Sequence, residues 1–399
     1  MAINTESSPL LPNSVSHSAQ DKPTIRGSLK ALFFSSKFNL LLIFVPLSLA
    51  FSYGGAPDTV VFSLNFMAIM PLAKLLGFAT EELAMMSGPT IGALLNATFG
   101  NVVELILGVI ALKDGLIRVV QASVMGSILS NILLVLGFCF LLGGAGRIDQ
   151  QFSMTAAQTS SSLLAITTLS LLVPAAFAGT AVASAKDTEI GVLNLSHGTA
   201  IVLLIVYGLS LFFQLKTHRH QYDDGDESED DEEEPQTTMT FSLLSLLAIA
   251  GLVSVHADFL VGAIEGVVDQ WEINETFVGV ILLPIVGNAA EHVSSVTFAM
   301  KNKMNLSINI AISSSLQIGL FVTPVLVIAG WIFDQPMTLF FEDFETVVLF
   351  ASVFVVNYLI QDGRSNWLEG VLLLASYTII SLAFWFHPVT SLSNGLRLH

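Results

Sequence analysis

The sequence has little charge and almost no cysteine. Of its 399 residues, 12% are charged and 53% are hydrophobic, whereas about 25% of residues are charged in a typical soluble protein. The chain therefore lacks the polar side chains that would cover a soluble globule of this size. The one cysteine, Cys139, lies in an apolar run, which excludes a disulfide framework and a cysteine-rich metal site. Basic clusters are also absent, so we expect no nucleic-acid partner.

Long apolar runs are abundant instead. A helix needs about 20 apolar residues to cross the hydrocarbon layer of a membrane. The chain contains eleven such runs, at roughly 39–56, 59–78, 89–112, 119–144, 155–178, 192–215, 240–268, 276–300, 305–333, 344–361 and 366–387. The sequence thus predicts an all-α polytopic protein with eleven transmembrane helices in a lipid bilayer. Most Lys and Arg residues outside these runs fall on the side of the N-terminus, which places the N-terminus in the cytosol and the C-terminus on the lumenal side.

Negative charge is concentrated in one segment between the sixth and seventh runs. Residues 223–234 contain ten acidic side chains. They are Asp223, Asp224, Asp226, Glu227, Glu229, Asp230, Asp231, Glu232, Glu233 and Glu234. Two interpretations stay open, namely a solvated linker, or an element that concentrates cations or senses calcium at the cytosolic entrance.

This acidic segment divides the chain into two halves. We expect a cytosolic N-terminal tail (1–37), a leading helix (38–58), a first five-helix repeat (59–217), an acidic cytosolic linker (218–239), a second five-helix repeat (240–388) and a lumenal C-terminal tail (389–399). Because each half has five helices, a linker on the cytosolic side gives the halves opposite orientations in the membrane. Such inverted repeats are common in secondary transporters.

A short motif recurs in the two halves. The sequence GNVVE at 100–104 matches GNAAE at 287–291, an offset of 187 residues. At the same offset Ser127 aligns with Ser314. Most other positions differ, so the overall similarity of the two halves is weak. The polar residues that do match are the ones that are most costly to place inside a membrane.

The two glutamates of this motif, Glu104 and Glu291, are the strongest candidates for chemistry. An acidic residue in mid-span costs several kcal/mol and normally faces a polar cavity. The asparagine three residues earlier lies on the same helical face, and the glycine before it permits local unwinding that exposes carbonyl oxygens. Gly100, Asn101, Gly287 and Asn288 would thus join the two carboxylates near the midplane. Such oxygen ligands suit a hard divalent cation, calcium first. The structural alternative is a pair of acids that only holds helices together.

Further polar residues flank the motif. Ser127, Ser314 and Gln317 lie in otherwise apolar runs and either line the same cavity or simply pack helices closely. His292 follows Glu291 and is either a packing histidine or a proton-titratable neighbour of the carboxylate. Glu81 and Glu82 lie at the cytosolic end of a predicted span, where they attract cations or cap a helix.

Paired buried carboxyl groups also suit proton exchange. Burial penalises the charged form of a carboxyl group, so the pair can bind protons or a divalent cation, whereas holding both at once is costly. Competition for the same carboxylates is the simplest physical basis for exchange. A pH difference of one unit supplies about 1.4 kcal/mol per proton. We therefore expect a secondary active transporter of calcium and protons, not an enzyme, and no cofactor.

These motifs resemble those of the calcium/proton exchanger (CAX) family of the cation/calcium antiporter superfamily, and in particular its fungal vacuolar members. The resemblance rests on NATFGNVVEL, PIVGNAAEH and SSSLQ, and extends through ATEELA, the acidic segment and SNWLEG. It implies eleven helices with two inverted five-helix repeats, and calcium export from the cytosol into an acidic organelle. It makes Glu104 and Glu291 the exchange carboxylates and His292 a modulator. Asn101, Asn288, Ser127, Ser314 and Gln317 become supporting oxygen groups, and the acidic segment a regulatory or cation-recruiting element. One departure is Pro89, where family members carry Asn, so no ligand role is carried over to it.

The resemblance and the N-terminus together suggest a location. Residues 6–11 (ESSPLL) resemble an acidic dileucine sorting signal of the kind used for vacuoles and lysosomes. We therefore expect a multi-pass protein of the vacuolar membrane. Whether it forms a homodimer, and whether it also carries manganese, stay open.

Three alternative functions share some of these features. A sodium-coupled calcium exchanger has the paired motif but needs additional cation sites, and His292 argues against it. A cation channel can use rings of acidic residues, but two inverted repeats in one chain favour alternating access. An intramembrane zinc hydrolase needs more nitrogen ligands than one His beside one Glu, and the sequence contains no HExxH motif.

Overall fold

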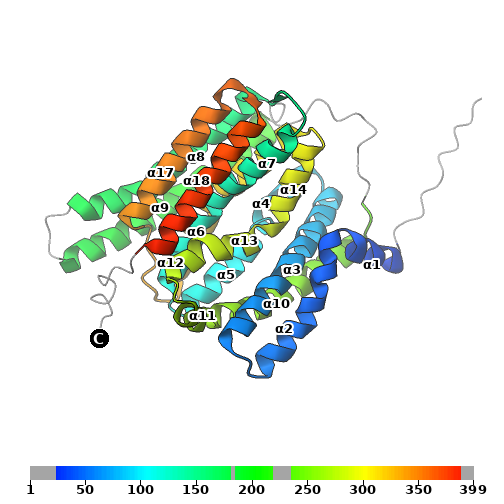
Figure 1. Cartoon of the computed structure of the whole chain (residues 1–399), viewed down its shortest axis with the longest axis horizontal. Helices are drawn as coiled ribbons and strands as arrows, with labels where there is room; N and C mark the ends of the chain where they lie inside the picture. The colour runs from blue at the N-terminus through cyan, green and yellow to red at the C-terminus, as the bar shows by residue number, and fades with distance from the viewer. Residues whose placement is uncertain (1–23, 181–184, 219–234, 388–399) are drawn as a thin grey trace, which may run out of the picture.

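The structure is a computed structural model and describes residues 24–180, 185–218 and 235–387 (Figure 1). Three sets of expectations lie outside these residues. They are the start of the N-terminal tail with its ESSPLL motif, the acidic segment 223–234, and the C-terminal tail 389–399.

The described residues are almost entirely helical. Before the acidic segment the elements are α1 (Ile25–Phe34), η1 (Lys37–Ile43), α2 (Phe44–Tyr53), α3 (Asp58–Ser87), α4 (Pro89–Phe99), α5 (Val102–Lys113), α6 (Ile117–Leu129), η2 (Ser130–Val135), α7 (Leu136–Gly144), β1 (Gln150–Gln151), α8 (Met154–Thr180), α9 (Ala185–Phe212) and η3 (Phe213–Thr217). After it come α10 (Met239–Gly262), α11 (Ile264–Trp271), α12 (Glu275–Phe277), η6 (Val278–Leu282), α13 (Leu283–Gly287), α14 (Ala289–Met300), α15 (Met304–Gln317), η7 (Ile318–Val322), α16 (Thr323–Ile332), α17 (Asp343–Leu359), η8 (Ile360–Asp362), β2 (Arg364–Ser365) and α18 (Trp367–Phe386). The η segments are short stretches of 3₁₀-helix (η1, η8) or π-helix (η2, η3, η6, η7). β1 and β2 pair antiparallel, with Gln150 opposite Ser365.

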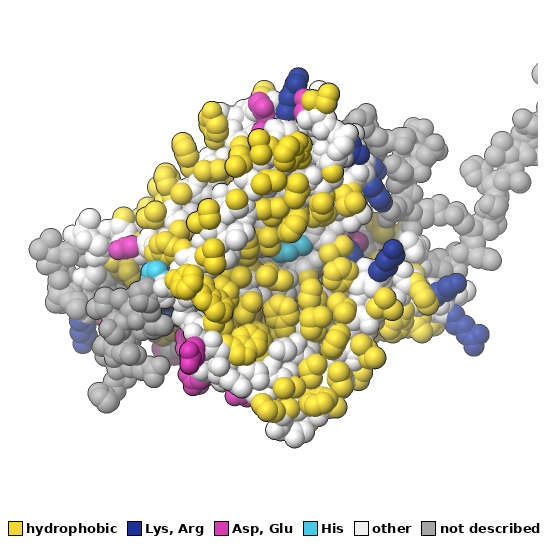
Figure 2. All heavy atoms as spheres, viewed as in Figure 1, with side chains coloured by type: hydrophobic (Ala, Val, Ile, Leu, Met, Phe, Trp, Pro, Cys, Tyr) yellow, Lys and Arg dark blue, Asp and Glu magenta, His cyan; other side chains and the backbone are white. Residues whose placement is uncertain are grey.

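The helices have the length and composition of membrane spans. Among the described residues, eight helices are long and apolar enough to cross a membrane, and ten if each of two bent helix pairs is one span. Hydrophobic side chains cover most of the face seen in Figure 2, and charged side chains gather towards its edges. The all-α polytopic class is therefore confirmed. Of the eleven predicted runs, 89–112 has no counterpart in this count, because α4 and α5 are each too short to span the hydrocarbon layer.

Two helices are interrupted at the repeated motif. Gly100 and Asn101 separate α4 from α5, and Asn288 separates α13 from α14. Asn101 (φ −107°, ψ 26°) and Asn288 (φ −87°, ψ 9°) leave the helical conformation, and the helix axis bends by 62° at Asn288. Such an interruption releases backbone carbonyl and amide groups from the helical hydrogen-bond pattern. It places polar backbone atoms beside the two glutamates, each of which lies in the first turn of the following helix.

The element bounds repeat with the spacing of the sequence motif. Adding 187 to the bounds of α5 gives 289 and 300, the bounds of α14. The same shift carries the start of α6 onto that of α15, and the start of α7 onto that of α16. The π-helical segments η2 and η7 also end at corresponding residues, Val135 and Val322. The two halves thus share the local structure around the motif and not only the motif itself.

The halves meet where α6 crosses η6. A Cβ atom built on Gly126 would lie 2.1 Å from the carbonyl oxygen of Val280, and one on Gly279 would lie 2.5 Å from Cβ of Ala122. Both glycines are therefore required by close approach of the two backbones, as in other tightly packed membrane helices. This crossing places α6 next to η6 and α13, the segments that lead into the second motif.

We expect Gly126→Ala to lower the free energy of unfolding by about 1–3 kcal/mol, the usual cost of overpacking a tight contact. Gly251→Ala in α10 is the control, because no atom lies within 4 Å of the added methyl group and alanine favours a helix. Unfolding of the purified proteins in detergent measures both. Equal stability of Gly126→Ala and the parent protein would contradict the close crossing.

A buried polar cluster attaches the leading helix α2 to α3 and α10. His256 of α10 is fully buried, and its Nδ1 lies 2.7 Å from Oδ1 of Asn65 and 3.1 Å from Oγ of Ser48. Asn65 in turn donates to Oγ of Ser52 at 3.0 Å. Figure 1 shows α2, α3 and α10 grouped at one side of the molecule. These bonds fix α3, which forms one wall of the site described below.

Candidate functional site

A cavity of about 340 Å³ lies between the two interrupted helices. Its walls come from the second half of α3, the end of α4, the first half of α14 and most of α15. Both motif glycines, Gly100 and Gly287, line it. The two copies of the motif, 187 residues apart in sequence, therefore converge on one cavity.

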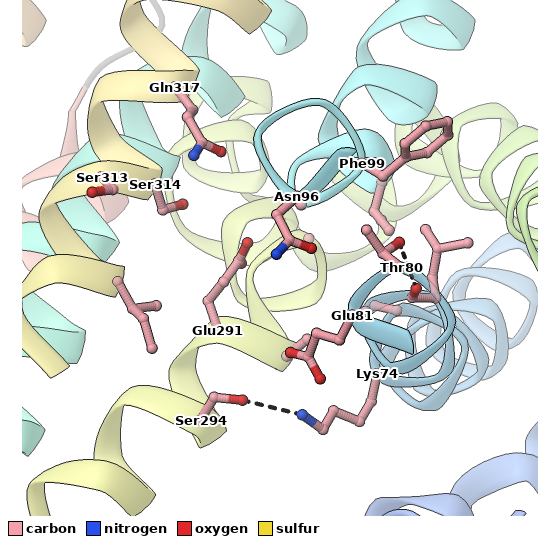
Figure 3. A pocket seen from close by; sticks show the side chains of 18 of the residues that line it. Lys74, Thr80, Glu81, Asn96, Phe99, Glu291, Ser294, Ser313, Ser314 and Gln317 are labelled. Carbon is pink, nitrogen blue, oxygen red and sulfur yellow. Dashed lines mark hydrogen bonds between the residues drawn. The ribbon is translucent and has the colours of Figure 1, made fainter. Parts of the chain in front are cut away.

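Glu291 projects into this cavity. In Figure 3 its carboxyl group points from α14 towards Asn96 of α4, with Ser314 and Gln317 of α15 nearby. Its Oε2 atom is buried and has no hydrogen-bond partner among the described residues. A carboxylate oxygen left in this state needs a proton or a cation to compensate its lost hydration.

Glu104 lies directly behind the cavity wall. A Cβ atom built on Gly287 would come within 2.8 Å of Oε1 of Glu104, so the carboxyl group rests against the interrupted backbone of the second motif. Both of its oxygens are buried, and no described residue donates a hydrogen bond to them. Gly287 lies four residues before Glu291, so Glu104 rests against the same interrupted backbone that carries Glu291. Both carboxyl groups therefore lie beside the interruption of the second motif.

The asparagines of the two motifs have different surroundings. Asn101 donates from Nδ2 to Oε1 of Gln317 and accepts at Oδ1 from Oγ of Ser314 at 3.2 Å. Ser314 also accepts a bond of 2.9 Å from Nδ2 of Asn131. Asn288 is fully buried, yet neither Oδ1 nor Nδ2 has a partner within the described part of the chain. The Asn288 carboxamide therefore has an unused oxygen beside the cavity wall, although it does not line the cavity itself, whereas the oxygen of Asn101 is engaged.

His292 and Ser127 lie outside the cavity wall. Nε2 of His292 is 3.2 Å from Oγ of Ser130, so this ring connects α14 to the start of η2. Ser127 is buried on α6 and does not line the cavity. The two serines that match in sequence thus have different positions, since Ser314 lines the cavity and Ser127 does not.

The neighbouring glutamates Glu81 and Glu82 also have different surroundings. Glu81 lines the cavity at the end of α3 (Figure 3). Glu82 is 2% exposed, and its Oε2 accepts bonds of 2.8 Å from both N and Oγ1 of Thr237. The expectation that Glu82 lies at an entrance is therefore corrected, because its side chain connects α3 to the residues preceding α10.

Sequence reasoning missed several residues of the cavity, among them Lys74, Asn96, Ser294 and Asn309. A signal for Lys74 was present, because it is the one Lys or Arg inside any of the eleven predicted runs. Asn96 lies one turn before Gly100 on α4 and was likewise visible as a polar residue in an apolar run. Asn309 and Ser294 also lie in predicted runs, but each has several other polar residues close to it in sequence, so nothing singles it out.

The ligand chemistry fits an oxygen-bound cation. In the described ranges, no three His, Cys, Asp or Glu side chains lie close enough together to hold a metal ion by themselves. The oxygens that line the cavity and suit a cation are those of the Glu291 carboxyl group and of the Ser313 and Ser314 hydroxyls, while Glu104 and Asn288 are buried beside its wall. Carboxylate and carbonyl oxygens are what calcium takes in proteins.

Comparison with known proteins places this arrangement in a family. A profile described as sodium/calcium exchanger protein matches residues 57–216 and 241–386. The chain is 50% identical over 386 residues to a vacuolar calcium ion transporter of Schizosaccharomyces pombe, which covers 96% of this chain and 93% of that protein. It is 47% identical over 361 residues to a Ca²⁺/H⁺ antiporter of Aphanothece halophytica, with 88% and 96% covered.

A solved structure has the same architecture. The structure of native YfkE matches with a TM-score of 0.75 and 36% sequence identity, and covers 87% of this chain and 99% of that one. The family profile spans most of the residues that form the helices and includes both copies of the GNxxE motif. This chain therefore belongs to the sodium/calcium exchanger protein family.

Proposed function

We propose that this protein is a vacuolar calcium/proton antiporter, a secondary active transporter that moves cytosolic calcium into an acidic organelle in exchange for lumenal protons. The observation that carries the proposal is the position of the two carboxyl groups at one cavity, since Glu291 lines it and Glu104 rests against its wall at Gly287. Both oxygens of Glu104 and Oε2 of Glu291 are buried without a partner among the described residues. The names of the relatives in Schizosaccharomyces pombe and Aphanothece halophytica, a vacuolar calcium ion transporter and a Ca²⁺/H⁺ antiporter, support it.

Charge balance supplies the exchange mechanism. Two buried carboxylates are neutralised equally well by one calcium ion or by two protons, and the unneutralised pair is the costly state. Calcium bound by Glu104, Glu291 and Asn288 would leave when protons take its place. Because the empty charged pair is disfavoured, the site changes sides loaded with one or the other, which couples the two fluxes.

We further propose that α4 and α5 together form an eleventh span and that residues 59–217 and 240–388 are inverted repeats. The shared element bounds at an offset of 187 support the repeat. In the orientation that the Lys and Arg distribution favours, the N-terminus is cytosolic and the C-terminus lumenal. The cavity then faces the cytosol, since it extends towards the end of α3 and the start of α15, next to Lys301 and Lys303.

The decisive experiment is uptake of radioactive calcium into proteoliposomes with an acidic interior. We expect uptake that collapses when a protonophore removes the pH gradient. Uptake that survives the protonophore and follows an imposed sodium gradient would instead assign a sodium-coupled exchanger. Unlabelled manganese added outside tests whether a second divalent ion competes for the same carboxylates, since oxygen ligands also suit manganese.

A further inference from the structure

Lys74 places a positive charge near the middle of α3, the helix that forms one wall of the cavity. It lies on α3 (Asp58–Ser87), within a run of apolar residues, and its side chain lines the cavity. An ionisable residue inside a membrane span is costly and normally has a function. Nothing in the exchange mechanism described above uses this residue.

The ammonium group faces the wall that carries Glu291. Nζ of Lys74 donates to Oγ of Ser294 at 3.1 Å, and Ser294 lies one turn after Glu291 on α14. Figure 3 shows this bond crossing from α3 to α14, with the side chains of Glu81 and Glu291 both above it in this view. Lys74 and Glu291 line the same cavity, so the positive charge acts on the Glu291 carboxylate at short range. The hydrogen bond of the ammonium group, in contrast, goes to a neutral hydroxyl.

We propose that Lys74 is a tethered cation that competes with the transported ion for Glu291 and thereby lowers the calcium affinity of the site. The inference rests on the proposed antiport and adds a specificity-determining residue to it. An ion entering the cavity meets a fixed positive charge, and Coulomb repulsion grows in proportion to the charge of the ion. Lys74 therefore penalises calcium about twice as strongly as a proton at the same position.

The consequence is faster release. A transporter that binds calcium too tightly cannot discharge it against a high concentration, so a built-in competitor raises the dissociation rate at the expense of affinity. Because Lys74 belongs to α3 and Ser294 to α14, any sliding of these helices also changes the distance between the ammonium group and Glu291. The strength of the competition then differs between the two sides of the membrane.

The test compares side chains at position 74 that differ in charge with side chains that keep the charge and differ in shape. In proteoliposomes we expect Lys74→Gln and Lys74→Met to lower KM for calcium about tenfold and to lower kcat as release slows. Lys74→Arg keeps the charge and should keep KM within about twofold of the parent. Ser294→Ala removes the hydrogen bond but not the charge and should also leave KM within about twofold.

A labelling experiment separates charge from folding. In a Cys139→Ser background, Lys74→Cys is purified in the folded state and then modified with either an ammonium-bearing or a neutral methanethiosulfonate of similar size. Cys139 is the one native cysteine and is buried. Only the ammonium label should restore the high KM, and equilibrium calcium binding should follow the same order.

The outcomes distinguish this inference from the proposed function. If the parent protein shows no proton-driven uptake, the antiport proposal itself fails. If the parent exchanges calcium for protons but neutral and charged groups at position 74 give the same KM, the tethered-cation proposal is overturned. A rise of KM for calcium in Lys74→Gln would assign Lys74 a structural role. So would a fall of KM in Ser294→Ala as large as the one in Lys74→Gln.

Discussion

Replacing Glu104 or Glu291 by glutamine should reduce calcium exchange by at least about 100-fold while the protein remains folded. Glutamine has nearly the same shape but carries neither a negative charge for calcium nor an exchangeable carboxyl proton. The loss corresponds to about 3 kcal/mol, a modest share of the interaction between a divalent ion and a buried carboxylate. Proton-driven uptake in proteoliposomes measures transport, and unfolding in detergent measures stability. Stability should be unchanged or higher, since the buried oxygens have no partner to lose.

Glu82→Gln is the matched control for this experiment. Glu82 is also a buried carboxylate, but its oxygen is bonded to Thr237 and does not line the cavity. Its substitution should lower stability by about 1–3 kcal/mol, the cost of weakening a bonded charge, and leave KM for calcium unchanged. Normal transport by either Glu104→Gln or Glu291→Gln would make these carboxyl groups structural. A loss in Glu82→Gln as large as theirs would place the exchange site elsewhere.

Gly287→Ala should lower the maximal exchange rate by roughly 10- to 100-fold with little change in stability. The added methyl group would lie 2.8 Å from Oε1 and 3.1 Å from Cδ of Glu104. The end of this side chain can move, so the fold tolerates the change, but the carboxyl group is displaced from the position it takes beside Glu291. Overpacking of this kind costs about 1–3 kcal/mol. Here we expect it to displace the Glu104 carboxyl group and so slow exchange, with little effect on the free energy of unfolding.

Gly77→Ala adds the same methyl group to the opposite wall of the cavity. Gly77 also lines the cavity, and no atom lies within 4 Å of the new carbon. We expect transport within about twofold of the parent. Similar losses of exchange rate in the two variants would mean that any narrowing of the cavity blocks ion passage. The contact between Gly287 and Glu104 would then not explain the loss in Gly287→Ala.

Much of this arrangement follows from local sequence. The cost of polar groups in a membrane makes apolar runs and buried acids visible without any tertiary information. For that reason the helices and the two GNxxE motifs could be predicted, and the offset of 187 that relates the motifs also relates α5 to α14. The interrupted third run shows where such reasoning stops, because hydropathy averages over the break at Asn101 and reports a single span.

Contacts between the halves could not be predicted. Glu81 and Glu82 are adjacent in sequence, and which of them faces the cavity depends on the rotation of α3 against α10. The bonds from Asn131 to Ser314 and from Ser130 to His292 each join residues more than 160 positions apart. They depend on how η2, which continues α6, packs against α14 and α15, and no periodicity of the sequence encodes that packing.

Asn101 and Asn288 occupy corresponding positions, yet the carboxamide of Asn101 is bonded at both Oδ1 and Nδ2, whereas that of Asn288 has no partner at either atom among the described residues. In a transporter of two related halves, the inward-open and outward-open states interconvert as the halves exchange conformations. Identical halves would make those two states equal in free energy. Each unmatched hydrogen bond, worth about 1 kcal/mol, removes that degeneracy, and about 1.4 kcal/mol gives a tenfold population difference. We therefore expect the divergence of the two halves to give the transporter a preferred resting orientation even in the absence of any ion gradient.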